Sequence, residues 1–216
     1  CYYFLSRPRR FGKSLLMSTI EAYLSGRKDL FEGLAIEKLE TEWTQYPILH
    51  LDLNSQKYDT PEALTDILNN AVSQWEQTYG IVETEKSLGM RFGGVMQRAY
   101  EKTGRQVVVL IDEYDKPLLQ AYGNDDLLND YRGTLKAFYG NLKSCDKYIK
   151  FALLTGVTKF GKVSVFSDLN NLMDISMDLR YAPICGITEG ELHDYFDNEI
   201  QLLAEAQKMT VEETYA

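Results

Sequence analysis

The sequence predicts an α/β fold with a mostly parallel sheet, and three observations support this prediction. Short apolar runs alternate with longer amphipathic segments, which is the pattern of strands joined by helices. The run 107–111 is apolar throughout, as expected of a strand covered on both faces of a parallel sheet. The chain has 216 residues, of which 44% are hydrophobic and 25% charged, a composition that supports one sizeable core.

The first predicted strand is the aromatic and apolar segment 2–6. Pro8 and Gly12 prevent this strand from continuing, because both residues favour turns. From Lys13 onward apolar residues recur at helical spacing, and Gly26 supplies the stop. The chain therefore opens with a strand, a tight loop and a helix.

The next part of the chain predicts a second strand and two helices. Residues 48–53 form the strand. Thr60 can accept a hydrogen bond from a free N–H group and Pro61 suits the first helical position, so a helix is expected from there to about Tyr79. A further helix is expected over 93–102.

The remaining elements follow the same alternation. After the strand 107–111, the sequence predicts a helix within 127–142 and a strand over 151–156. Residues 161–173 carry mixed signals, and we expect a loop with short helical turns there. A capping-box pattern at Thr188 opens a helix that extends to about residue 207.

Composition excludes several classes of protein. No apolar run approaches the roughly 20 residues of a membrane-spanning helix, and no segment has the layout of a signal peptide. Three widely spaced cysteines, Cys1, Cys145 and Cys185, fit a reducing compartment better than a disulfide framework. We therefore expect a cytoplasmic protein with no membrane contact. The chain begins with a cysteine, and we expect it to be part of a longer protein.

Charge is distributed unevenly along the chain. The net charge is −9, yet residues 1–28 carry six basic side chains and one acidic side chain, which leaves −14 for the rest. A basic block on an acidic chain indicates a local anion site. Direct nucleic-acid binding by these residues is not expected, because it needs Lys and Arg spread over a surface.

The basic block contains the parts of a phosphate-binding loop. Gly12 permits close backbone approach, Lys13 can reach the β- and γ-phosphates, and the Ser14 hydroxyl can ligate Mg²⁺. The pattern G-x-x-x-x-G-K-[S/T] wants a glycine where this chain has Arg7; if that position needs a positive φ, the arginine costs about 1–2 kcal/mol. The residues expected to bind nucleotide are Arg9, Arg10, Phe11, Gly12, Lys13, Ser14 and Leu15.

Two acidic residues end the apolar strand 107–111. A carboxylate at the carboxyl end of a parallel strand lies where ligands bind in open α/β sheets. Asp112 is expected to hold Mg²⁺ together with Ser14, and Glu113 to activate water as a general base. Thr155 ends the next strand; its hydroxyl could sense the γ-phosphate or orient the water, or it could cap the turn before Gly156.

Four segments together resemble the AAA-ATPase-like family of bacterial P-loop proteins over nearly the whole chain. They are residues 6–16 (SRPRRFGKSLL), 110–118 (LIDEYDKPL), 155–172 (TGVTKFGKVSVFSDLNNL) and 185–192 (CGITEGEL). In that family an arginine commonly stands at the position of Arg7.

The resemblance implies a P-loop NTPase three-layer sandwich of the branch with an additional strand between the phosphate-loop strand and the acidic strand. It implies a core over 1–186 and the beginning of a helical lid over 187–216. It also implies a further domain similar to PD-(D/E)xK nucleases, for which residues 1–216 show no convincing active-site pattern. Lys159 or Lys162 could act as a finger residue, as could a residue from an oligomer or a protein partner.

Three functions remain open from the sequence. The leading one is an ATPase that hydrolyses MgATP to ADP and phosphate and drives a conformational change in a larger protein. A non-hydrolysing nucleotide-binding interaction or switch module is the alternative. A P-loop kinase of a small metabolite is a third, which the adjacent Asp112 and Glu113 favour less.

Overall fold

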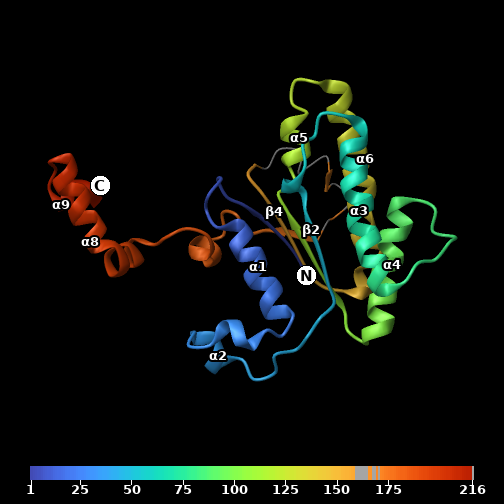
Figure 1. The fold of residues 1–216 in the computed structure, drawn as a ribbon, viewed down its shortest axis with the longest axis horizontal. Helices are drawn as coiled ribbons and strands as arrows, with labels where there is room; N and C mark the ends of the chain where they lie inside the picture. The colour runs from blue at the N-terminus through green and yellow to red at the C-terminus, as the bar shows by residue number, and fades with distance from the viewer. Residues whose placement is uncertain (159–164, 167–168, 170, 216) are drawn as a thin grey trace.

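The computed structural model describes residues 1–158, 165–166, 169 and 171–215. Its centre is a five-stranded sheet in the order β2-β3-β4-β1-β5, and every strand pair is parallel (Figure 1). Helices cover both faces of the sheet. The predicted α/β fold with a mostly parallel sheet is therefore confirmed.

Four of the five strands coincide with predicted strands. The strands are β1 (Tyr2–Ser6), β2 (Ile48–Asp52), β3 (Val107–Asp112), β4 (Ile149–Gly156) and β5 (Leu172–Asp174). The sequence did not predict β5, which pairs with β1 at the sheet edge. Its three residues give too short an apolar run to stand out from the loop expected over 161–173; most of that loop lies outside the described residues.

Strand β4 lies between β1 and β3, which confirms the additional strand that the resemblance implied. In the register Ser6 pairs with Gly156, Ile111 with Leu154, and Asp52 with Asp112. The carboxyl ends of four strands therefore meet at one edge of the sheet. That edge receives the loop after β1 and the acidic residues after β3.

Three long helices cover one face of the sheet (Figure 1). They are α3 (Pro61–Tyr79), α4 (Leu88–Thr103) and α6 (Asp125–Ser144), with the short α5 (Lys116–Gln120) beside them. The main core lies between these helices and alternate residues of the strands, such as Val107, Val109 and Ile111 of β3. Burial of both faces explains why β3 reads as a continuous apolar run.

The opposite face is covered by α1 (Lys13–Leu24). Met17 packs in a second cluster with Val108 and Leu110, the β3 residues that point away from the main core. Short elements connect α1 to β2 and complete the turns elsewhere: η1 (Lys28–Phe31), α2 (Ala35–Leu39), η2 (Leu53–Ser55) and η3 (Asp146–Tyr148). The two clusters hold the start of α1 against the edge where the strands end.

Two helix boundaries and one capping contact differ from the predictions. Helix α4 begins five residues earlier than expected, because the Ser87 hydroxyl accepts a hydrogen bond from the amide of Met90 at 3.2 Å. Helix α6 is longer at both ends and begins after Asn124, whose side chain accepts from the Leu127 amide. The Thr60 side chain makes no capping hydrogen bond, although α3 begins at Pro61 as predicted.

The chain continues from β5 through η4 (Leu179–Ile184) to α8 (Glu189–Gln207) and α9 (Val211–Tyr215). The predicted capping box at the start of α8 is present: the Thr188 amide donates to Glu191 at 2.8 Å, and the Glu191 amide donates to the Thr188 hydroxyl at 3.2 Å. The rings of His193 and Tyr215 stack at 4.1 Å and join α8 to α9. Figure 1 shows this pair standing apart from the sheet.

Candidate functional site

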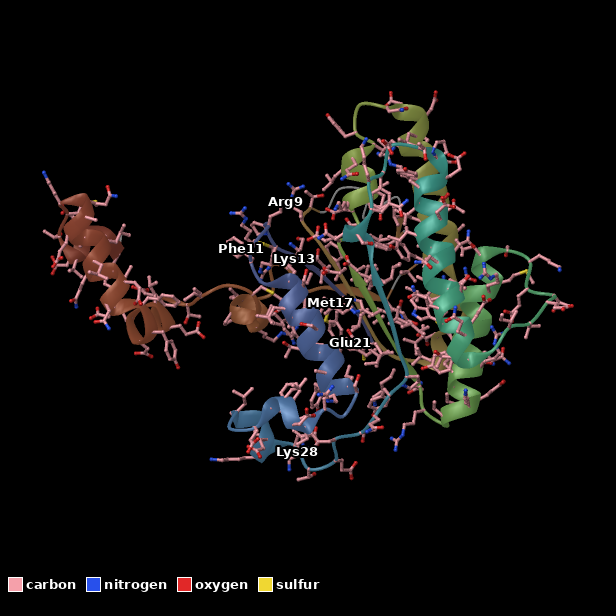
Figure 2. All side chains as sticks on the ribbon, in the orientation of Figure 1. Arg9, Phe11, Lys13, Met17, Glu21 and Lys28 are labelled. Atoms are coloured by element: carbon pink, nitrogen blue, oxygen red, sulfur yellow. The ribbon has the colours of Figure 1, made fainter. Side chains whose placement is uncertain are left out.

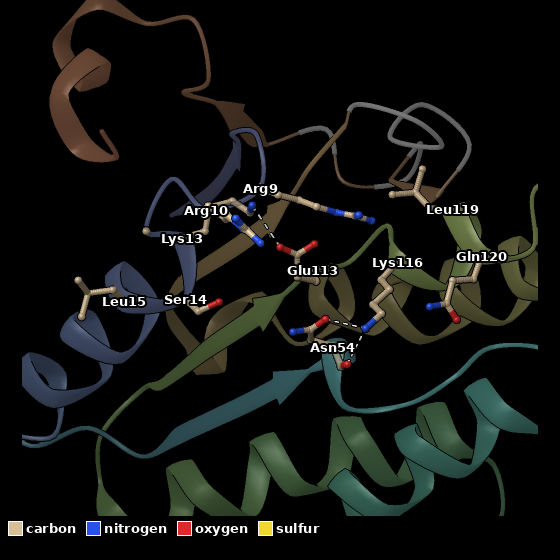
Figure 3. A pocket seen from close by; sticks show the side chains of 11 residues that line it. Arg9, Arg10, Lys13, Ser14, Leu15, Asn54, Glu113, Lys116, Leu119 and Gln120 are labelled. Carbon is tan, nitrogen blue, oxygen red and sulfur yellow. Dashed lines mark hydrogen bonds and ion pairs between the residues drawn. The ribbon is translucent and has the colours of Figure 1, made fainter. Parts of the chain in front are cut away.

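A cavity of about 630 Å³ opens at the edge where the strands end (Figure 3). The phosphate loop and α1 form one wall, and the segments that follow β2 and β3 form the other. Its lining residues are Arg9, Arg10, Gly12, Lys13, Ser14, Leu15, Asn54, Glu113, Lys116, Leu119 and Gln120. The lining holds four basic side chains and one carboxylate, so the cavity favours an anionic ligand.

The backbone of the loop is shaped for an anion. Arg10 and Gly12 have positive φ values of 68° and 79°, a conformation that turns consecutive N–H groups into one concavity. Gly12, the N-cap residue of α1, has no side chain to cap the first turn, and no acidic residue lies in that turn. Within the described part of the chain the N–H groups at the start of α1 are therefore available to an anion. A side chain at Gly12 would meet open space, so glycine serves the φ angle there.

Lys13 is almost fully buried, with 4% of its side chain exposed. Its ammonium donates to the carbonyl oxygens of Arg7 and Pro8, each at 3.2 Å, and forms an ion pair with Glu113 at 3.1 Å. The lysine is thus folded back into the loop. An anion that binds here competes with the Glu113 carboxylate for the ammonium group.

Asp112 joins the loop to the acidic strand. The Ser14 hydroxyl donates to its Oδ2 at 2.6 Å across 98 residues of sequence. A hydroxyl and a carboxylate in contact are oxygen ligands of the kind that Mg²⁺ prefers. Within the described ranges no group of three His, Cys, Asp or Glu side chains could hold a metal ion, so a magnesium ion here would complete its shell with phosphate oxygens and water.

Thr155 is fully buried and does not line the cavity. Its hydroxyl donates a short hydrogen bond to Asp112 Oδ1 and accepts one from the Glu113 amide at 3.4 Å. This geometry favours an indirect role, in which Thr155 orients the two acidic residues, over direct contact with phosphate or water, which was one of the two roles considered from the sequence.

Glu113 has a positive φ of 55°, which is uncommon for a residue with a side chain. The Tyr114 amide donates to the Thr155 carbonyl at 2.9 Å and fixes the turn that follows. In Figure 3 the carboxylate of Glu113 points into the cavity, beneath the extended Arg9 side chain. Backbone strain of this kind persists where the surrounding structure enforces it, and it concentrates at functional sites.

Arg7 does not have the strained backbone that the motif comparison anticipated. Among the described residues other than glycine, positive φ values occur at Arg10, Glu113 and Lys208. The cost of about 1–2 kcal/mol for an arginine in place of the first glycine is therefore not incurred.

Phe11 lies outside the main cavity. It lines a neighbouring cavity of about 610 Å³ together with Leu15, Cys185 and Ile187. Burial raises the pKa of the Cys185 thiol, although the charges of Arg7 and Lys13 oppose that shift. An apolar compartment therefore adjoins the phosphate loop.

The far wall of the main cavity contains residues that had no predicted role. Lys116 donates from its ammonium to the carbonyl and side-chain oxygens of Asn54, each at 2.6 Å. Gln120 accepts a hydrogen bond from the Tyr58 amide at 2.8 Å. These contacts join η2 and the loop after it to α5, and no sequence spacing reveals them because they depend on two strands ending side by side.

Asp115 is a second position that the sequence did not assign. It is fully buried, and its carboxylate accepts from the amides of Val157 and Thr158 and from the Thr158 hydroxyl at 2.8–3.2 Å. Gly156 permits this packing, because a Cβ there would lie 2.6 Å from the Tyr114 ring. Lys159 and Lys162, the candidate finger residues, lie outside the described residues.

No helix in the described part of the chain combines the length and the apolar character required to span a bilayer.

The strand order, the loop that joins β1 to α1 and the acidic end of β3 define the P-loop NTPase class, in the branch with an additional central strand. The chain belongs to the family described as Predicted AAA-ATPase, whose sequence profile matches residues 1–166.

A relative from Azotobacter chroococcum mcd 1, described as an uncharacterized protein in vnfD 5'region, is 38% identical over 200 residues. The match covers 92% of this chain and 39% of the relative, so the chain spans well under half of that protein's length. No solved structure matches the chain significantly.

Proposed function

We propose that this chain binds MgATP and hydrolyses it to ADP and phosphate. The observation that carries the proposal is the contact network of Lys13, Ser14, Asp112 and Glu113. Two sequence segments about a hundred residues apart supply these groups: Lys13, Ser14 and Glu113 line one cavity, and Asp112 accepts a hydrogen bond from Ser14. Membership of the Predicted AAA-ATPase family supports ATP as the nucleotide.

In the proposed complex the triphosphate binds at the start of α1, where N–H groups are free and Lys13 and Arg10 line the cavity. Arg9 adds a further cation from the loop. The base occupies the adjoining apolar cavity, whose lining includes Phe11, Leu15 and Ile187. Of the residues expected from the sequence to bind nucleotide, this arrangement uses Arg9, Arg10, Phe11, Lys13 and Leu15.

The Ser14 hydroxyl and the Asp112 carboxylate fit a magnesium ion and would hold it. When bound, Mg²⁺ neutralises charge on the phosphate oxygens. Lys13 binds phosphate oxygens through its ammonium group, and Glu113 accepts a proton from the attacking water. Thr155 positions Asp112 and Glu113 through its hydroxyl.

The proposed reaction requires the ion pair between Lys13 and Glu113 to open. Phosphate oxygens would replace the carboxylate at Lys13, which frees Glu113 to contact water. The same pair supports the alternative function, a nucleotide-binding switch with negligible turnover, because a glutamate that stays on Lys13 cannot act as a base.

The wider role is also a proposal. Residues 187–216 would begin a helical lid beyond a core over 1–186, and hydrolysis would move that lid within a larger protein. A further domain, or a partner that supplies a finger residue, would receive the movement. The free cysteines at 1, 145 and 185 favour a cytoplasmic location.

Calorimetric titration of MgATP and MgADP tests the proposal. The Lys13→Ala variant should lose at least about tenfold in affinity, since a hydrogen bond to a charged group is worth about 1.5–3 kcal/mol. Lys28→Ala is the matched control, because Lys28 is exposed and lies beyond the far end of α1 (Figure 2). Absence of saturable binding by the folded wild type would refute the proposal.

A further inference from the structure

Arg7 occupies the position where the phosphate-loop motif has its first glycine, and both terminal nitrogens of its guanidinium donate hydrogen bonds within the fold. It donates to the carbonyl oxygens of Ser6 and Tyr181 at 3.2 and 3.3 Å, and makes a short hydrogen bond to the carbonyl oxygen of Ser176. The side chain is half-buried. Two of its three acceptors belong to the segment that leads from β5 towards α8.

Other contacts join the same two segments. The amide and the hydroxyl of Ser6 both bond to the Ser176 hydroxyl, at 2.9 and 3.1 Å, and the Ile175 amide donates to the Phe4 carbonyl at 2.9 Å. The Arg7 amide donates to the Gly156 carbonyl at 3.2 Å. The start of the phosphate loop is thereby fixed to β4 on one side and to the segment after β5 on the other.

An arginine suits this position for a chemical reason. The planar guanidinium presents several N–H donors in a fixed fork, so it can satisfy carbonyl groups five residues apart at once. An ammonium group lacks that fixed fork, and a glycine supplies no donor. Carbonyl acceptors carry no formal charge, so these hydrogen bonds restrain the loop without neutralising the positive charge of Arg7.

The restrained segment also lines a second apolar compartment, which shares Phe11, Cys185 and Ile187 with the cavity of about 610 Å³. A cavity of about 490 Å³ is lined by Arg7 and Phe11 on the loop side and by Ser176, Cys185 and Ile187 on the other. A ligand that fills this compartment contacts the loop and the segment together. The segment then continues directly into Thr188, the capping residue of α8.

We propose that Arg7 is a positioning residue that couples the phosphate loop to residues 176–188 and, through them, to α8. The coupling rests on the proposed nucleotide binding. Because coupling between two sites is reciprocal, nucleotide on the loop orders the segment, and an ordered segment favours nucleotide. Arg7→Gly completes the general motif and yet should weaken binding.

The test combines calorimetry with hydrogen exchange on the full chain. Arg7→Gly should raise the MgATP dissociation constant about tenfold. The dissociation constant of Arg7→Lys should lie between those of Arg7→Gly and the wild type. Guanidinium ion added in solution should restore part of the Arg7→Gly affinity, which a merely misfolded variant would not show. Arg27→Gly is the matched control, since the Arg27 guanidinium pairs with exposed Asp29 away from the loop.

Hydrogen exchange separates the coupling from the proposed function. Without nucleotide, the amides of Ile175, Ser176 and Tyr181 should exchange faster in Arg7→Gly than in the wild type and Arg27→Gly. With MgATP, residues 176–188 should gain protection in the wild type and not in Arg7→Gly.

Equal or tighter MgATP binding by Arg7→Gly would overturn the proposal, as would unchanged exchange in the segment. If the wild type binds no MgATP, the proposed function fails and the coupling fails with it. In that case hydrogen exchange measured without nucleotide still decides whether Arg7 restrains residues 176–188.

Discussion

Lys13 and Glu113 neutralise each other in the absence of a ligand. Both side chains are largely buried, and the Lys13 ammonium donates two further hydrogen bonds to backbone carbonyls of its own loop. An isolated buried ammonium would be costly, so the glutamate stabilises the ligand-free loop. The same carboxylate is the only acidic side chain that lines the cavity formed by the described residues. One residue therefore serves both the resting state and the proposed chemistry.

Glu113→Gln should separate nucleotide binding from hydrolysis. The amide cannot accept a proton, so turnover should fall by about 10²–10⁴-fold. MgATP affinity should hold or rise, because the competing charge on Lys13 is removed. Phosphate release and calorimetry on the same samples measure the two effects, and Glu32→Gln is an exposed control. Unchanged turnover would remove Glu113 from the mechanism, and undetectable turnover in the wild type would favour the switch.

The short motif at the loop was predictable because its chemistry lies in consecutive residues. Gly12, Lys13 and Ser14 match the consecutive residues of a phosphate-loop motif, and Asp112 follows an apolar run typical of a buried strand. The partners of Arg7 and Lys116 were not predictable. Those contacts join residues that are far apart in sequence, and they arise only when strands that end at the same edge bring their loops together.

Helices α3 and α4 are joined by a network that centres on Arg91. Its guanidinium donates to both carboxylate oxygens of Glu76, at 3.0 and 2.6 Å, and also to Asn69 and Ser73. The early start of α4 matters for this network, because Arg91 precedes the range 93–102 that periodicity predicted. Gly89, Gly93 and Gly94 interrupt the helical period there, so the boundary is set by the Ser87 cap and not by a visible apolar pattern.

The ion pair of Glu76 makes part of the stability depend on pH. Hydrogen bonding to Arg91 lowers the pKa of Glu76 below its ordinary value of 4.5. The unfolded chain therefore takes up the proton first as pH falls, so the stabilisation is complete at neutral pH and is lost below 4.5. Glu76→Gln should lower the free energy of unfolding by about 1–3 kcal/mol at neutral pH.

Urea unfolding of Glu76→Gln and the wild type at neutral pH and below 4.5 measures that dependence. The difference between the two proteins should shrink in acid. Glu62→Gln, an exposed position in the first turn of α3, should show no such trend. A difference that is constant with pH would mean that the pair contributes through packing alone.

Over the whole molecule, charge is separated between one cavity and the remaining surface. The chain carries a net charge of −9, whereas the cavity is lined by Arg9, Arg10, Lys13 and Lys116. An acidic exterior repels polyanions, while a recessed basic cavity attracts a compact anion. The alternation of strands and helices made this overall design predictable, because the carboxyl edge of a parallel sheet is where such a cavity forms. The position of α8 and α9 could not be predicted, because their contacts in the described residues are mainly with each other.

The charge separation predicts that MgATP binding weakens as salt is added and that oligonucleotides do not bind. MgATP affinity should fall several-fold between about 0.1 M and about 1 M salt, as the Debye length shortens from about 10 Å to about 3 Å. The double variant Arg9→Ala, Arg10→Ala should bind more weakly at low salt and depend less on salt. Labelled single- and double-stranded oligonucleotides should show no change in fluorescence anisotropy at protein concentrations high enough to saturate MgATP binding. A salt-sensitive rise in anisotropy that persists at saturating MgATP would instead reveal a nucleic-acid surface outside the cavity, and the acidic exterior would then not determine what the chain binds.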